Sequence, residues 1–122
     1  MVVNVNWILI AITCAFIVMD LITGFAQACV NHCVDSQKMK TGLWHKCGFL
    51  LAIIFGYLCE ITMQIVDLGF TIPVAYTVCV FIIMTEMVSN LENLGKISPE
   101  LKEKSFMKIF NAEGRGEMAD EK

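Results

Sequence analysis

The chain has 122 residues, of which 57% are apolar and only 17% are charged, and its mean hydropathy is +0.65. Soluble domains average about 45–50% apolar and about 25% charged residues. The composition therefore excludes a disordered chain, a nucleic-acid-binding protein and a two-domain enzyme, and it predicts a small membrane-embedded protein. The net charge of −3 says little by itself, because the last 27 residues hold 6 of the 9 basic and 6 of the 12 acidic side chains.

Three long apolar stretches follow one another along the chain. A helix needs about 20 mostly apolar residues to cross a bilayer core roughly 30 Å thick. The first stretch contains one charged residue, Asp20, the second contains only Glu60, and the third contains none. The runs are continuous rather than alternating and are too few for a closed barrel, so the sequence predicts an all-α membrane protein with three transmembrane helices. The predicted spans are residues 7–30, 47–66 and 68–85, within a transmembrane region at residues 1–95.

The composition changes after residue 95. Ser98, Pro99 and Glu100 have the pattern of an N-cap, a first-turn proline and a first-turn acid, which together predict the start of a helix. From Ala112 onward the chain is polar, small and mixed in charge, and this predicts disorder. Residues 96–122 are therefore expected to form a short cytoplasmic helix followed by a disordered tail.

The lysines predict the orientation of the protein in the membrane. Short cytoplasmic loops carry an excess of Lys and Arg. The connection between the first two spans contains Lys38, Lys40 and Lys46, whereas the N-terminus and the second connection contain no basic residue. Because further lysines follow the third span, we expect the N-terminus outside and the C-terminus in the cytoplasm.

Polar residues recur along one side of the first predicted span. Side chains seven residues apart lie on the same side of a helix. The sequence therefore predicts a polar stripe along the length of this span. Its members are Asn6, Thr13, Asp20 and Gln27, with Thr23, Gly24 and Asn31 on the same side.

Small residues recur at every fourth position of the second predicted span. Such residues allow the backbone of a neighbouring helix to approach closely. The pattern predicts a packing ridge that ends in a polar patch. The ridge consists of Gly48, Ala52, Gly56, Glu60 and Gln64, and Asp67 follows Glu60 by one heptad.

The free-energy cost of placing an acidic side chain in a bilayer indicates where Asp20 and Glu60 lie. A carboxylate near the middle of a bilayer costs about 2.5–3.5 kcal/mol on insertion scales. No Lys or Arg lies inside a predicted span, so Asp20 and Glu60 are expected to be protonated or to face a hydrated or shared interface. This favours self-association, and a three-helix monomer is too small to enclose a channel of its own. The alternative is that the acids only help the three helices of one monomer to pack.

No catalytic, cofactor or metal site is predicted. A group of His and Cys residues between the first two spans lacks the standard zinc spacing. The sequence contains no glycine-rich phosphate loop and no Ser/His/Asp arrangement. We therefore expect no enzymatic activity.

Four segments together carry a family pattern. They are residues 19–24, residues 38–46 with Thr41-Gly42-Leu43, residues 86–95, and residues 98–102. The most specific part is the run Glu86-x-x-Ser89-x-x-Glu92-Asn93, which leads to a glycine and then to a helix that begins with proline. In these segments the chain resembles the phage holin family that is shared with clostridial toxin-secretion proteins. The resemblance covers about residues 15–105.

The resemblance implies a function and a location. It implies a homo-oligomer in the bacterial inner membrane that opens lesions, through which a muralytic endolysin or, in some relatives, a large toxin leaves the cytoplasm. Asp20 and Gly24 would then lie at helix contacts, with Glu60 and Asp67 lining or joining subunits. The face shared by Glu86, Ser89 and Asn93 either hydrogen-bonds between helices or is a solvated helix end. The candidate oligomer and pore residues are Asp20, Gly24, Gln27, Gly56, Glu60, Gln64, Asp67, Glu86, Ser89, Glu92 and Asn93.

Two other functions stay open at this stage. One is a regulator of the antiholin type, which binds a holin and delays it with the same kind of helices. The other is a small proton-coupled transporter that exchanges a proton for a cationic drug. Transporters of similar length usually need four spans, and only three fit here.

Overall fold

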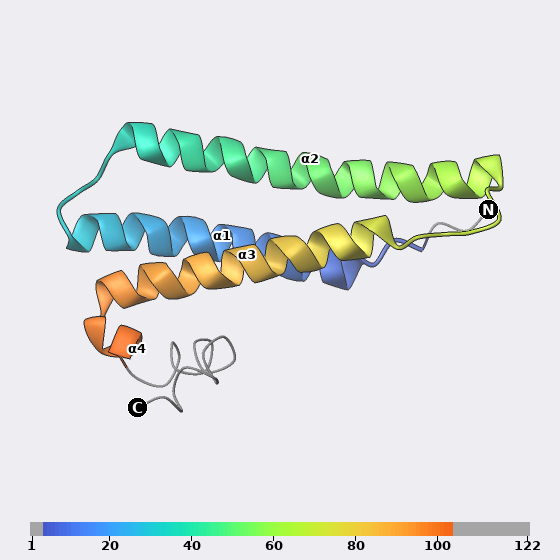
Figure 1. Cartoon of the computed structure of the whole chain (residues 1–122). Helices are drawn as coiled ribbons and strands as arrows, with labels where there is room; N and C mark the ends of the chain where they lie inside the picture. The colour runs from blue at the N-terminus through green and yellow to red at the C-terminus, as the bar shows by residue number, and fades with distance from the viewer. Residues whose placement is uncertain (1–3, 104–122) are drawn as a thin grey trace, which may run out of the picture.

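The computed structural model describes residues 4–103, which form four helices and no strand (Figure 1). Three of the helices are long and apolar enough to cross a membrane. The predicted all-α membrane fold with three long helices and a short fourth one is therefore confirmed. The helices are α1 (Trp7–Val30), α2 (Ser36–Val66), α3 (Val74–Ile97) and α4 (Pro99–Glu103).

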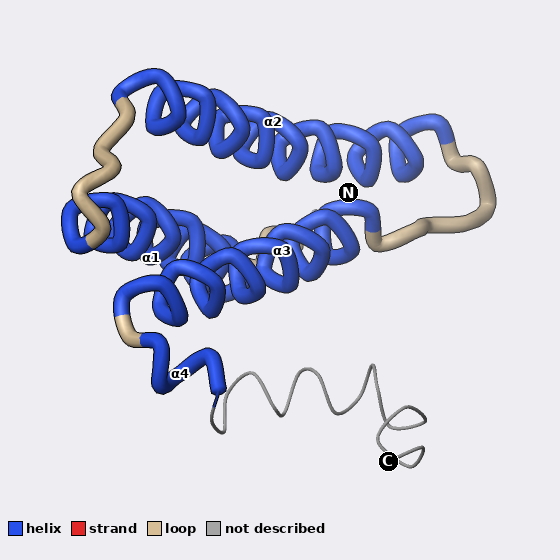
Figure 2. The backbone as a smooth tube through the Cα atoms, turned by 60° about the vertical axis from the view of Figure 1, so that its left-hand side comes forward, coloured by secondary structure: helices blue, strands red, loops and turns tan. Residues whose placement is uncertain are grey.

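The three long helices form an up-down-up bundle. Helices α1 and α3 lie side by side and run in the same direction, and α2 runs antiparallel to both (Figures 1 and 2). The contact between α1 and α3 is the most extensive, α2 packs mainly on α3, and α1 and α2 touch very little. The start of α1 and the end of α3 therefore lie at opposite ends of the bundle.

A small apolar core holds the bundle together. Ile17, Ile53, Cys79 and Ile82 are buried between the three long helices. Most other large apolar side chains point outward, among them Leu51 and Phe55 of α2 and Phe81 of α3. Exposed apolar surface on every long helix is unfavourable in water, but it is what a lipid-facing bundle requires.

Helix α2 begins earlier than the predicted second span. The Asp35 carboxylate accepts hydrogen bonds from the backbone N–H groups of Gln37 at 2.9 Å and Lys38 at 3.4 Å, which is an N-cap. The helix has 31 residues, about 46 Å at 1.5 Å per residue, so it is longer than the bilayer core is thick. The three lysines assigned to the first connection therefore lie within α2.

The connection between α2 and α3 is longer than predicted. The third span was expected from residue 68, but α3 begins at Val74, after Pro73 at its N-cap position. Proline fits a helix start because it has no N–H to leave unpaired. Asp67 and Gly69 have positive φ angles of 52° and 76° and reverse the chain. Because α3 extends to Ile97, the polar residues of segment 86–95 lie inside this helix.

Gly69→Ala is expected to destabilise the protein by about 1 kcal/mol, because a Cβ disfavours a φ of +76°. No atom lies within 4 Å of where that Cβ would be, so the strain comes from the backbone and not from a clash. Gly69→Asn is expected to cost less, since asparagine tolerates the left-handed region. Denaturation of the purified protein by sodium dodecyl sulfate measures both changes. Equal losses for Ala and Asn would contradict this explanation.

The predicted C-terminal helix is present over Pro99–Glu103. It begins where the proline and the first-turn acid indicated. The rest of that predicted helix and the predicted disordered tail lie outside the described residues.

Candidate functional site

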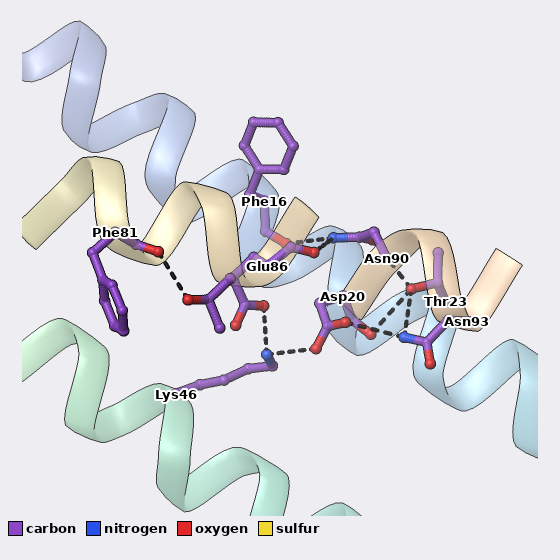
Figure 3. A network of polar contacts seen from close by, with 9 residues as sticks. Phe16, Asp20, Thr23, Lys46, Phe81, Glu86, Asn90 and Asn93 are labelled. Carbon is purple, nitrogen blue, oxygen red and sulfur yellow. Dashed lines mark hydrogen bonds and ion pairs between the residues drawn. The ribbon is translucent and has the colours of Figure 1, made fainter. Parts of the chain in front are cut away.

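One lysine joins the three long helices in the middle of the bundle. Lys46 Nζ lies 2.6 Å from Asp20 Oδ2 and 2.6 Å from Glu86 Oε2 (Figure 3). The exposed fractions of the three side chains are 9%, 13% and 3% respectively. The cluster therefore contains two carboxylates and one ammonium group, one from each helix, almost entirely shielded from the surroundings.

The lengths of the helices bring these three side chains to the same depth. Asp20 lies ten residues before the end of α1 at Val30, and Lys46 lies ten residues after the start of α2 at Ser36. In an antiparallel hairpin, positions equally far from the turn lie opposite each other. Glu86 lies eleven residues before the end of α3. At 1.5 Å per residue, all three are about 15 Å from the same end of the bundle.

The ion pairs of Lys46 correct the expectation for Asp20 and leave the expectation for Glu60 open. Asp20 was expected to have no basic partner, and this is wrong because the N-cap at Asp35 brings Lys46 inside a membrane-spanning helix. A buried charge is tolerated when it is paired and hydrogen-bonded. Among the described residues, Glu60 forms no ion pair.

Amide and hydroxyl groups extend the ion cluster between α1 and α3. Asn93 Nδ2 donates to Asp20 Oδ1 at 3.0 Å and to Thr23 Oγ1 at 3.1 Å. Thr23 Oγ1 donates to Asn90 Oδ1 at 3.2 Å, and Asn90 Nδ2 donates to the backbone oxygen of Glu86 at 2.7 Å. Figure 3 shows these side chains converging from both helices. We call the six residues the polar network: Asp20, Thr23, Lys46, Glu86, Asn90 and Asn93.

Every buried polar atom of the polar network has a hydrogen-bond partner. Within residues 4–103, no buried side-chain nitrogen or oxygen lacks a hydrogen-bond partner. Satisfied networks of this kind hold helices in one register, and a partly broken one is costly in a low-dielectric interior. The alternative that the acids of the spans, Asp20 and Glu60, only help one monomer to pack therefore describes Asp20 in this structure, and Glu86, which lay outside the predicted spans, packs in the same way.

An open cleft leads from the polar network to the end of the bundle. Its volume is about 640 Å³, and all three long helices line it. Asp20, Lys46 and Asn93 lie at its inner end. The first ten residues of α2 are exposed apart from the half-buried Gly42, which indicates that this part of the helix stands away from α1 and α3. Among the predicted site residues, Gly24, Gln27 and Ser89 line the cleft.

The other half of the bundle contains a close contact between α2 and α3. A Cβ on Gly56 would lie only 2.9 Å from Ala75 Cα, so the glycine allows the two backbones to touch. One turn further, Glu60 Oε1 accepts a hydrogen bond from Ala75 N at 2.9 Å. Glu60 thereby satisfies a backbone N–H in the first turn of α3, where negative charge is favoured. The predicted ridge does not pack along its whole length, since no atom lies within 4 Å of a Cβ on Gly48.

The remaining predicted residues lie apart from the polar network. Gln64 and Asp67 line a shallow cavity of about 490 Å³ near the connection between α2 and α3. Glu92 is exposed on α3. The structure thus brings Asp20, Glu86 and Asn93 together, with Gly24, Gln27 and Ser89 next to them.

Sequence reasoning missed Lys46 and Asn90 as site residues. Lys46 was counted as a loop lysine, and the signal that could have placed it was the N-cap pattern at Asp35. Asn90 lies in the family-like segment 86–95, four residues after Glu86 and thus on the same side of the helix. Within the described residues, no cluster of His, Cys, Asp and Glu could hold a metal ion.

Comparison with protein families gives a clear match. The family model for the bacteriophage holin family matches residues 1–109. Comparison with curated proteins finds no match, and comparison with solved structures finds none.

Proposed function

The chain belongs to the bacteriophage holin family, and from this premise we propose that it oligomerises in the bacterial inner membrane and opens lesions that release an endolysin. The observation that carries the proposal is a polar network that opens into a cleft, inside a bundle whose exterior is apolar. Such a bundle is stable in lipid as a monomer because its polar side chains face inward. The same side chains could line an aqueous lesion after the helices rearrange.

The lesion is proposed to form between copies rather than within one. The interior of a single bundle is filled by the apolar core on one side and by the ion cluster on the other. In an assembly, the cleft-facing residues Gln27, Ser89 and Asn93 would face water instead of α2. This requires two arrangements of the same helices, which is the usual basis of a switching transition.

The orientation is proposed from the lysines that lie at one end of the bundle. Lys38 and Lys40 near the start of α2 and Lys96 near the end of α3 lie at the same end of the bundle. Lys46 no longer counts toward this asymmetry, since it is buried. By the excess of basic residues in cytoplasmic segments, this end faces the cytoplasm and the N-terminus lies outside.

Timed expression of the full chain tests the proposed function. The chain is induced alone in a bacterium that also makes a cytoplasmic endolysin, and membrane potential and escape of the enzyme are recorded. We expect a delay, then abrupt depolarisation, enzyme release and lysis. Chemical crosslinking before and after depolarisation is expected to show larger oligomers afterwards.

Other outcomes assign the chain elsewhere. Continued growth with an intact potential, combined with a delay of lysis by a co-expressed holin, would indicate a regulator of the antiholin type. Resistance to cationic drugs that disappears with an uncoupler would indicate proton-coupled transport. A reporter fusion that places the C-terminus outside would contradict the proposed orientation.

A further inference from the structure

Two of the lysines that line the cleft form no ion pair with the described residues. The cleft lining contains three lysines, Lys38, Lys46 and Lys96, and two carboxylates, Asp20 and Asp35. Lys46 is already neutralised by Asp20 and by Glu86. Both carboxylates already accept hydrogen bonds, Asp20 from the polar network and Asp35 from the backbone at the start of α2. Among the described residues, ion pairs involve Lys46 alone, so the ammonium groups of Lys38 and Lys96 are the unpaired charges that line the cleft.

The two unpaired lysines come from different helices. Lys38 lies three residues into α2, and Lys96 is the penultimate residue of α3. They therefore lie at the rim of the cleft near the end of the bundle, which is where the headgroups would lie in a bilayer that the three long helices cross. The volume of about 640 Å³ is within the usual range of ligand sites, roughly 300–1,000 Å³.

The cleft also offers an apolar surface beside the lysines. Leu21, Phe25 and Met39 line it, and Phe25 and Met39 are partly exposed. A free phosphate ion has no apolar part that could contact this surface, whereas the glycerol backbone and upper acyl chain of a lipid would cover it. Basic pockets between transmembrane helices on the cytoplasmic side are known to bind anionic lipid headgroups.

We propose that the cleft binds the headgroup of one anionic phospholipid, with the phosphate between Lys38 and Lys96 and the upper acyl chain against Leu21, Phe25 and Met39. The lipid thus bridges the start of α2 and the end of α3, at the end of the bundle where these helices separate. This binding requires only the folded monomer and does not depend on whether the chain forms lesions.

Lipid titration of the full-length protein in a non-ionic detergent, followed by native mass spectrometry, tests the proposal. Phosphatidylglycerol is the anionic probe, phosphatidylcholine the zwitterionic one and inorganic phosphate the free anion. We expect saturable binding of one phosphatidylglycerol per chain and much weaker binding of the other two probes. Lys38→Gln and Lys96→Gln are each expected to weaken binding about fivefold, since a lysine near a membrane surface is worth about that factor.

Lys40→Gln is the matched control. It removes the same charge from the same helix two residues away, outside the cleft lining. We expect it to weaken binding by no more than about twofold, as a diffuse surface charge does. Equal losses for Lys38, Lys40 and Lys96 would overturn the site in favour of general surface attraction. Equal binding of phosphatidylcholine or of inorganic phosphate would overturn the assignment of an anionic lipid.

Discussion

Lys46→Met is expected to destabilise the bundle by about 3–5 kcal/mol, because it leaves the buried carboxylates of Asp20 and Glu86 facing each other without their shared ammonium group. Methionine retains most of the apolar stem of the lysine, so the loss reports on the charge rather than on packing. Denaturation of the purified protein by sodium dodecyl sulfate measures the change.

Two further variants separate the ion cluster from a general effect of losing a lysine. Lys40→Met changes an exposed residue of the same helix and is expected to alter stability by no more than about 0.5 kcal/mol. Replacing all three charged residues, as Lys46→Met with Asp20→Asn and Glu86→Gln, is expected to recover most of the loss because no unpaired buried charge remains. If Lys46→Met and Lys40→Met have the same stability, the carboxylates of Asp20 and Glu86 are not shielded from water, and the prediction is wrong.

The same variant has an expected consequence for the proposed lesion. Before Lys46, every residue of α2 is exposed except the half-buried Gly42, so this lysine is the first firm contact of the helix with the bundle. Without it, the first part of α2 is expected to move away and uncover the cleft-facing side of α1 and α3. Lys46→Met should therefore trigger depolarisation earlier than the unmodified chain at equal expression, whereas Lys40→Met should not.

Gly56→Ala is expected to destabilise the contact between α2 and α3 by about 1–3 kcal/mol, the usual cost of forcing an extra methyl group into a packed interface. The new Cβ would lie 2.9 Å from Ala75 Cα and 3.1 Å from Ala75 N. Backbone atoms cannot rotate aside, so the two helices must separate. The hydrogen bond from Ala75 N to Glu60, one turn away, would lengthen with them.

Gly48→Ala provides the matched control for this change. It lies two turns earlier on the same ridge and has no atom within 4 Å of its added Cβ. Both substitutions gain about 1 kcal/mol of helix propensity, so the difference between them isolates the clash at Gly56. Thermal or detergent denaturation that gave both variants the same stability would show that α2 and α3 do not touch at this glycine.

The hydropathy of the chain was sufficient to predict its fold class. Three apolar runs of about 20 residues admit few structures other than membrane-spanning helices. The ends of the helices were harder to predict, because caps decide them locally. Asp35 begins α2 before the apolar run, and Pro73 delays α3 beyond the start of its apolar run.

The candidate site was predicted only in part. The polar stripe of the first span is present as Asp20, Thr23 and Gln27, and the segment 86–95 supplies its partners on α3. Glu60 was expected to be protonated or to face a hydrated or shared interface, and this stays open; the structure adds that it accepts a hydrogen bond from the backbone of α3. A sequence pattern gives the side of a helix on which a residue lies but not the helix that this side contacts.

Composition and local spacing were enough to predict a membrane protein whose helices carry polar faces and which resembles the holin family, because these properties do not depend on how the helices pack. The packing of the helices was needed to show that Asp20 and Glu86 share Lys46, that Gly56 touches Ala75, and that a cleft with two unpaired lysines opens between the helices. These features depend on which residues reach the same depth in the bundle. That depth is fixed by the exact start and end of each helix and by the packing of α2 against α3.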